Sequence, residues 1–267
     1  MDFVAARDLA TALDAKAGDP GAELLAGGTD LMVEVNLAYH RPAGVISVSH
    51  CEELLEWTDR RIGAAVTWAR LEEGPHRALA QLAATIGSPQ IRAAGTLGGN
   101  VGTASPAGDG LPWIAAMNGS IEVASRDRGS RTVPWDEFFV GVKQTALAPD
   151  EIITAIVVPD DAPAVQEFAK VGVRNAMVIA TVSCVVARGE DGFRVALGSV
   201  APTPIRAVGA EAMLNSAVSI DDSVLAEFAA MVSDEVRPIT DHRSTEAYRR
   251  HASGVVARRL VERCVAA

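Results

Sequence analysis

Residues 87–109 restrict the fold of this chain more than any other stretch, because they are long, rich in glycine and almost free of charge. The pattern predicts a loop, and a loop of this length in a compact domain is usually either functional or disordered. Ile91, Leu97 and Val101 supply apolar side chains for burial, which favours order. We therefore expect an ordered loop that serves a function.

Two glycine pairs, Gly27-Gly28 and Gly98-Gly99, each follow apolar residues and precede a small polar residue. Glycine lets the backbone adopt a positive φ and aim consecutive N–H groups at an anion such as a diphosphate. Neither pair fits GxGxxG or GxxxxGK(S/T), which disfavours a Rossmann dinucleotide site and a P-loop. Either pair alone is compatible with a simple tight turn. The two together, followed by Asn100 and Asp109, favour a phosphate-binding site.

The overall charge and composition exclude several classes of protein. The chain of 267 residues has a net charge of −10, and an acidic surface repels phosphate backbones, so we expect no nucleic-acid partner. Apolar residues make up 49% of the chain, enough for a buried core, but aromatic residues only 4%. The core must therefore be built from Ala, Val, Leu and Ile.

The cysteines, Cys51, Cys184 and Cys264, lie far apart in the sequence, and none belongs to a CxxC pair. A thiolate zinc site or an iron–sulfur cluster held by this chain is therefore disfavoured, and a reducing compartment is indicated. The N-terminus lacks the apolar region of a secretory signal, and no apolar run reaches the ~20 residues of a membrane span. We expect a cytoplasmic protein with no membrane span and no bound metal.

The spacing of apolar residues predicts an α+β chain in two parts. The first part, residues 1–160, mixes short strands and helices, including one helix over 68–86 that leads into the glycine-rich segment. The second part, residues 165–267, begins with strands over 176–188 and 193–200 that are joined by a hairpin turn at Gly189–Gly192. Its remaining predicted elements are helices over 206–216, 221–233 and 245–265.

Side chains with catalytic potential are not clustered in the sequence. A GxSxG motif is absent, and the five histidines are scattered. No catalytic residue can be assigned, and any redox or transfer chemistry requires a cofactor.

Short motifs recur along nearly the whole chain: Leu25–Leu31, Ile62–Thr67, Gln90–Asn100, Ser105–Asp109, Asp136–Gly141, Pro149–Ile153, Phe168–Arg174, Val200–Arg206 and Tyr248–Arg250. In their order and composition the chain resembles the FAD-binding medium subunits of molybdenum-containing hydroxylases. Relatives in that family are the medium subunit of carbon monoxide dehydrogenase and the flavin domain of xanthine dehydrogenase.

The resemblance implies a two-part FAD-binding domain of the PCMH type over residues 1–160. A smaller C-terminal α+β domain, with an antiparallel sheet and helices, would occupy residues 165–267. Backbone N–H groups would wrap the FAD diphosphate and ribose, Asp109 would bind a polar group of FAD, and Ile153 would lie against the nucleotide or flavin. The implied cofactor-binding residues are Leu24, Leu25, Ala26, Gly27, Gly28, Thr29, Asp30, Leu31, Thr96, Leu97, Gly98, Gly99, Asn100, Asp109, Ile153 and Lys170.

Lys170 is one of only three lysines in the chain. It is either an ordinary solvated lysine or, as the resemblance implies, a cation that reaches the flavin and stabilises negative charge on the reduced ring. We favour the second interpretation. The chain departs from the family pattern at Ala93-Ala94, Phe168 and Ala169, which leaves the environment of the flavin less defined than its binding.

The resemblance implies an oxidoreductase subunit that carries FAD. A large partner subunit would hold the molybdenum cofactor, and a small one would hold 2Fe–2S clusters that pass electrons to the FAD and on to an acceptor. Two alternatives stay open from the sequence: a free-standing FAD-dependent oxidase or dehydrogenase of a small molecule, and a non-enzymatic FAD-binding protein.

Overall fold

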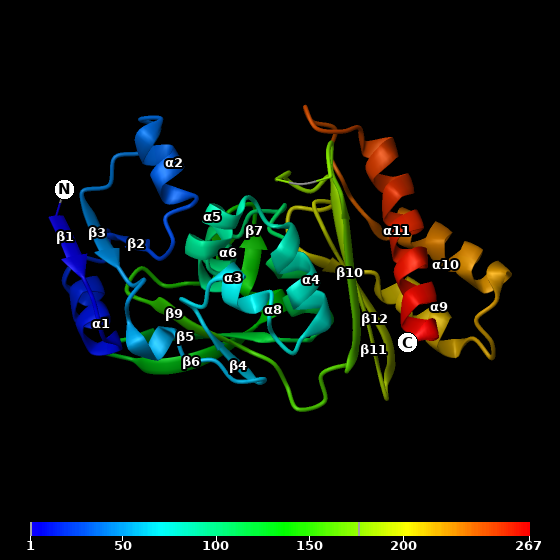
Figure 1. The fold of residues 1–267 in the computed structure, drawn as a ribbon, viewed down its shortest axis with the longest axis horizontal. Coiled ribbons are helices and arrows are strands. Elements are labelled where there is room, and N and C mark those ends of the chain that lie inside the picture. The colour runs from blue at the N-terminus through cyan, green and yellow to red at the C-terminus, as the bar shows by residue number, and fades with distance from the viewer. Residues whose placement is uncertain (1, 176) are drawn as a thin grey trace.

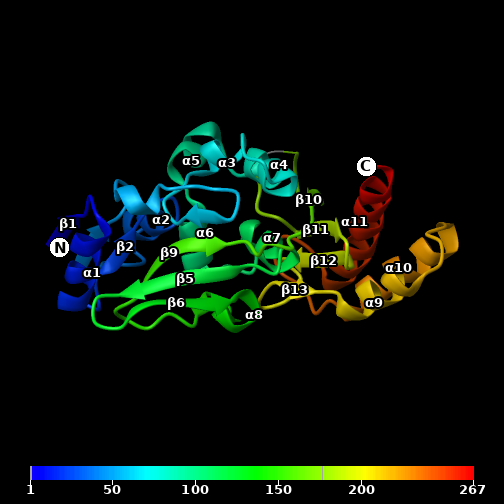
Figure 2. The same ribbon diagram turned by 90° about the horizontal axis from the view of Figure 1, so that it is seen from below.

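The computed structural model describes residues 2–175 and 177–267. Three bodies lie in a row along the long axis of the molecule: a small N-terminal sheet, a central sheet with its helices, and a C-terminal sheet with its helices (Figures 1 and 2). In this described part of the chain, no helix has the length and apolar character needed to cross a membrane. The mixture of helix and sheet confirms the α+β class.

The N-terminal body is a parallel sheet with strand order β1-β3-β2. The helices α1 and α2 each connect two of its strands. Asp8 begins α1 by accepting a hydrogen bond from the N–H of Thr11 at 2.7 Å, a common helix cap. The elements are β1 (Asp2–Ala5), α1 (Leu9–Gly18), β2 (Glu23–Leu25), α2 (Leu31–Asn36) and β3 (Gly44–Ser47).

The central body is an antiparallel sheet with strand order β4-β9-β5-β6, covered by short helices. Its strands are β4 (Arg61–Gly63), β5 (Ser120–Ser125), β6 (Gly129–Pro134) and β9 (Ile152–Val157), and β7 (Phe139–Gly141) pairs with β8 (Gln144–Thr145). Its helices are the 3-10 turn η1 (Glu52–Leu54), α3 (Trp68–Leu71), α4 (Arg77–Thr85), α5 (Pro89–Ala94), α6 (Leu97–Thr103), α7 (Gly110–Ala116) and α8 (Trp135–Phe138).

Two sequence predictions for this body were wrong. The single helix expected over 68–86 is split into α3 and α4, because Gly74-Pro75 interrupts the helical hydrogen bonds. The expected loop over 87–109 contains α5 and α6. Ser88 and Thr96 cap these two helices through their hydroxyl groups, so the glycines of α6 are compatible with a helix that tertiary packing stabilises.

The C-terminal body is an antiparallel sheet with strand order β10-β11-β12-β13 and three helices on one face. The expected hairpin is confirmed, since Gly189 pairs with Gly192. The elements are β10 (Val165–Val171), β11 (Val182–Gly189), β12 (Gly192–Gly198), β13 (Ile205–Arg206), α9 (Val208–Ser216), α10 (Asp222–Glu235) and α11 (Glu246–Ala266).

The sequence reading misplaced the start of this sheet. The strand expected over 176–188 begins only at Val182, and residue 176 lies outside the described residues. Strand β10 was missed because its buried residues include Gln166 and Glu167, which hide the apolar pattern. Both are paired: Gln166 accepts from the Trp113 indole at 3.2 Å, and Glu167 accepts from Gln81 at 2.9 Å.

The C-terminal sheet is buried on both faces. Phe168, Val185 and Ala196 belong to the apolar core of the central body, whereas Cys184 and Leu197 belong to a second core formed with α9, α10 and α11. Figure 1 shows this sheet standing between the central helices and the C-terminal helices. The central core therefore includes residues from both parts of the chain.

Candidate functional site

The two glycine pairs, far apart in sequence, lie in segments that touch each other. Gly27 is packed so closely on the second segment that an added Cβ would lie 1.8 Å from the carbonyl oxygen of Ala94. The Asp30 carboxylate accepts a hydrogen bond from the Thr103 hydroxyl of α6 at 3.3 Å. The fold thus places residues 27–30 beside α6 and the turn before it, as the phosphate-site hypothesis requires.

The first glycine turn has unused hydrogen-bond donors. Gly28 adopts a φ of +69°, a conformation that favours glycine. Within the described chain, the backbone N–H groups of residues 27–31 donate no hydrogen bond, although the next amide, that of Met32, donates to the Gly28 carbonyl at 3.0 Å. A run of unpaired N–H groups at a turn is a suitable cradle for an anion.

The N–H groups of the second glycine pair are not free, although free backbone donors were expected there. The N–H of Gly98 donates to the carbonyl of Ala64 at 3.1 Å, and that of Gly99 donates to the Thr96 hydroxyl at 2.9 Å. An added Cβ at Gly98 would lie 2.5 Å from both Cβ and O of Ala64. Gly98 is therefore required for packing of α6, whereas Gly99 is exposed and an added Cβ there meets only the Thr96 hydroxyl at 3.1 Å.

Asp109 and Lys170 meet beside a cavity of about 270 Å³. The Lys170 ammonium lies 2.7 Å from the Asp109 carboxylate and also donates to the Thr85 carbonyl at 3.1 Å. Each side chain of the pair is only 8% exposed. Lys170 is therefore not a solvated surface lysine. Asn100 lines the same cavity and fixes α7 by accepting a hydrogen bond from the Gly110 amide at 3.1 Å.

The Asp109 carboxylate has unused hydrogen-bonding capacity. Its Oδ1 atom is buried and has no partner within the part of the chain that the structure describes. Burial raises the pKa of Asp109, and the Lys170 ammonium opposes that shift. A buried acceptor without a donor costs free energy, so a bound ligand with a polar N–H or O–H group would complete this site. FAD fits on this observation together with the unpaired amides of residues 27–31.

Unlike Asp109 and Lys170, the expected binding residue Ile153 lies outside the cavity lining. It is 8% exposed on β9 in the central core, and an added Cβ at Gly102 would lie 3.5 Å from its Cδ1. It therefore lies next to α6 and does not line the cavity beside Asp109. Leu24 and Leu25 lie on β2, which leads into the first glycine turn.

The residues that depart from the family pattern differ in what they contact. Side chains alternate along a strand, so Phe168 and Lys170 share one face of β10 and Ala169 faces the opposite way. Ala169 packs on the core formed with the C-terminal helices, so its small side chain does not alter the cavity. The Ala94 carbonyl forms the close contact with Gly27 described above.

The sequence reading missed part of the cavity wall. Met177 and Ile179 come from the connection between β10 and β11, and their apolar run was interpreted as strand. No sequence signal separates them from a strand; in the structure both are more than half exposed, unlike apolar residues of a buried strand. The cavity-lining residues not expected from the sequence are Trp68, Ile86, Gly87, Ala107, Met177, Val178 and Ile179.

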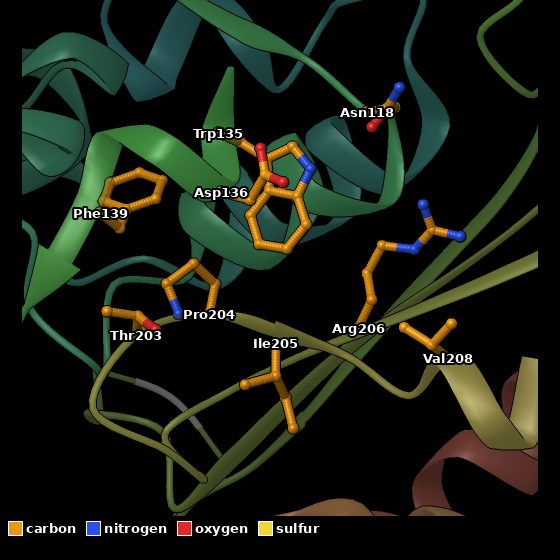
Figure 3. A pocket seen from close by; sticks show the side chains of 9 residues that line it. All are labelled: Asn118, Trp135, Asp136, Phe139, Thr203, Pro204, Ile205, Arg206 and Val208. Carbon is orange, nitrogen blue, oxygen red and sulfur yellow. The ribbon is translucent and has the colours of Figure 1, made fainter. Parts of the chain in front are cut away.

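A larger cavity, of about 520 Å³, contains none of the expected residues. Figure 3 shows Trp135 and Phe139 on one side of it and Pro204 and Ile205 on the other. Its charged lining residues are Arg206, which is paired with Glu211, and the exposed Asp136. For metals, residues 2–175 and 177–267 contain no group of three or more His, Cys, Asp or Glu placed to hold an ion.

Comparison with known families covers nearly the whole chain. Residues 1–161 match the family described as the FAD binding domain in molybdopterin dehydrogenase. Residues 167–264 match the CO dehydrogenase flavoprotein C-terminal domain.

Individual relatives agree with these matches. The chain is 30% identical to the xanthine dehydrogenase FAD-binding subunit of Escherichia coli O157:H7, over 98% of this chain and 95% of that one. It is also 30% identical to the carbon monoxide dehydrogenase medium chain of Hydrogenophaga pseudoflava, over 90% and 88% of the two chains.

Among solved structures, one similar chain comes from the Hydrogenophaga pseudoflava carbon monoxide dehydrogenase that lacks the Mo-pyranopterin moiety of the molybdenum cofactor. It superimposes with a TM-score of 0.90 at 27% identity, covering 100% of this chain and 97% of that one.

Proposed function

Since the chain belongs to the family of FAD-binding medium subunits of molybdenum hydroxylases, we propose that it relays electrons from iron–sulfur clusters of a partner to an acceptor. FAD is its cofactor. The relatives are described as a medium chain and an FAD-binding subunit, which supports assembly with other chains. In that assembly, a large subunit would carry the molybdenum cofactor and a small subunit the 2Fe–2S clusters, and the complex would work in the cytoplasm.

The observation that carries this proposal is the buried Asp109–Lys170 pair beside the cavity. When bound, FAD supplies the redox chemistry that no side chain of the site offers. The Lys170 ammonium would stabilise negative charge at the flavin end, and the unpaired Oδ1 of Asp109 would accept a hydrogen bond from the cofactor. Apolar side chains such as Met177 and Ile179 would limit access of water to this end of the site.

The remaining cofactor contacts would come from the segment of the first glycine turn. The unpaired amides of residues 27–31 would hold the diphosphate, and Leu24, Leu25 and Ala26 would place that turn. In the second segment, Thr96, Leu97 and Gly98 have amides or hydroxyls engaged within the protein. We propose that these residues shape the site, and that the cofactor runs over the exposed Gly99 and the half-buried Asn100.

Purification of the protein from its native source tests the relay. We expect this chain to co-purify with two other subunits and with molybdenum, iron and FAD. A lone yellow protein that oxidises a small molecule by itself would contradict the relay and support a free-standing oxidase or dehydrogenase.

Redox titration of two variants tests whether the Asp109–Lys170 pair lies near the flavin ring. Asp109→Asn removes a negative charge and should raise the flavin midpoint potential. Lys170→Met should lower it at high pH, where Asp109 is an unpaired carboxylate. Because burial already raises the pKa of Asp109, loss of Lys170 raises it further, so this carboxyl becomes protonated as the pH falls and the lowering should shrink.

Lys16→Met is a matched control for these variants. Lys16 is also 8% exposed, but its ammonium donates to the carbonyls of Pro20 and Ala22, away from the cavity. We expect this variant to lose stability without a change of midpoint potential. Equal potentials in wild type, Asp109→Asn and Lys170→Met would show that the pair does not lie near the flavin ring.

A further inference from the structure

Arg249, on the first turns of α11, is buried although it carries a charge. It is 3% exposed, and its guanidinium donates to the carbonyl of Thr181 at 2.6 Å and to that of Ser199 at 2.9 Å. The same group donates to the Asp241 carboxylate at 2.8 Å. One side chain therefore joins α11 to two segments that are distant in sequence and to the nearby Asp241.

The first of these carbonyls, that of Thr181, lies two residues beyond Ile179 of the cavity wall. Thr181 closes the connection between β10 and β11, because its N–H donates to the Val171 carbonyl at 2.7 Å. Met177, Val178 and Ile179 of this connection line the cavity, and Lys170 immediately precedes Val171. Arg249 thus holds the end of the segment that carries the apolar wall.

The second carbonyl, that of Ser199, belongs to a residue that is hydrogen-bonded to the segment before Asp109. Ser199 has a φ of 65°, and its N–H donates to the Pro106 carbonyl at 2.7 Å. Pro106 lies in the turn that precedes Asp109. Arg249 is consequently connected, through one residue on each side, to the segments that present Lys170 and Asp109.

A buried guanidinium is costly, and an apolar side chain of similar volume would pack α11 at least as well. What the guanidinium adds is several donors in a fixed planar arrangement, which can hold carbonyls of two elements at once. Its charge is balanced by Asp241. Burial alone would raise the pKa of Asp241, but hydrogen bonds from the Arg243 and Ser244 amides and from Arg249 outweigh it and lower that pKa to about 2.

We propose that Arg249 is a positioning residue for the flavin site, which fixes the segments bearing Asp109 and Lys170 relative to each other. This inference rests on the proposed function of the Asp109–Lys170 pair. The inference that Arg249 fixes residues 177–181 and 199 does not depend on the flavin, and the mobility of these residues can be measured without it.

The experiment compares Arg249→Met and Arg249→Lys with Arg250→Met in the full chain. Arg250 is a matched control, since its guanidinium also binds two carbonyls, those of Ser233 at 3.2 Å and Val236 at 2.7 Å, but at the end of α10. Hydrogen exchange of peptides covering residues 177–181 and 199–206 is measured without FAD. FAD affinity, the flavin midpoint potential and Tm are measured on the same proteins.

In Arg249→Met we expect exchange of both peptides to accelerate and FAD affinity to fall, each by about tenfold or more, because hydrogen bonds to a charged group are lost. The midpoint potential should also move. Arg249→Lys, which keeps the charge and fewer donors, should recover part of each effect. Arg250→Met should lower Tm without changing either flavin property.

If Arg249→Met does not fold, Asp241→Asn serves in its place, because it loosens Arg249 without removing it. Unchanged exchange would overturn the fixing of the two segments. Faster exchange with unchanged FAD affinity and potential would overturn the link to the flavin site. A third outcome is faster exchange in Arg249→Met while the Asp109 and Lys170 variants leave the flavin potential unchanged. That outcome would overturn the proposed function of the pair.

Discussion

The two glycine pairs have the same sequence and opposite structural roles. At Gly27-Gly28 the backbone leaves the N–H groups of residues 27–31 without partners in the described chain. At Gly98-Gly99 both N–H groups are satisfied by the protein, and Gly98 is packed against Ala64. A Gly-Gly pair in a sequence therefore indicates that the backbone closely approaches another group. It does not tell whether that group belongs to a ligand or to the protein itself.

The cause of the difference is the secondary structure that each pair enters. Gly28 precedes α2 in a turn with positive φ, where its carbonyl accepts from the Met32 amide but its own N–H has no partner in the described chain. Gly98 and Gly99 lie inside the first turn of α6, where the Thr96 hydroxyl caps a backbone donor. The Thr96 cap takes up the Gly99 donor and the Ala64 carbonyl takes up the Gly98 donor, whereas the first pair keeps its donors free in the described chain.

The largest effect is expected for Gly98→Val. Its side chain would collide with Ala64, including backbone that cannot move aside, so we expect a loss of more than about 3 kcal/mol in the free energy of unfolding. Thermal denaturation followed by circular dichroism should show Tm lowered by roughly 10 °C or more. A soluble variant with unchanged Tm would show that the Ala64 contact is not rigid.

A smaller effect, confined to the cofactor, is expected for Gly28→Ala. A non-glycine residue at positive φ costs about 1–2 kcal/mol, so the turn should populate other conformations and FAD affinity should fall about tenfold. Fluorescence titration of the apoprotein with FAD measures the affinity. Gly28→Asn is the control, because Asn tolerates positive φ and should retain most of the binding. Equal affinities for all three proteins would mean that this turn does not hold the diphosphate.

The smallest effect is expected for Gly99→Ala. The position is exposed, and an extra methyl in a helix offsets much of any crowding with Thr96, so Tm should stay within about 3 °C of wild type. If the cofactor runs over this face, FAD affinity should fall about fivefold, equivalent to roughly 1 kcal/mol. Unchanged affinity would confine the glycine contacts with the cofactor to the first pair.

Local patterns were sufficient to predict the elements whose residues alternate or cap regularly. The Gly189–Gly192 hairpin is an example, and it is confirmed. The helix α6 was missed because its glycines contradict helix propensity, and burial of Leu97 and Val101 overrides that propensity. Strand β10 was missed because its polar residues are buried with partners from other elements.

For the site, the motifs predicted which residues to consider but not how they meet. Asp109 and Lys170 are separated by 61 positions, and no periodicity relates them. Their contact depends on the β10–β11 pairing and on the turn before α7, which only the three-dimensional arrangement provides. The same holds for Arg249, whose acceptors are 68 and 50 positions away.

The two-sided burial of the C-terminal sheet has a consequence for how the chain unfolds. Sequence families divide the protein between residues 161 and 167, but Phe168, Val185 and Ala196 complete the core beneath Trp113. Cutting at the family boundary would expose that core to water, so a fragment ending at residue 161 should aggregate rather than fold. The two halves are expected to melt together in a calorimeter as one cooperative transition.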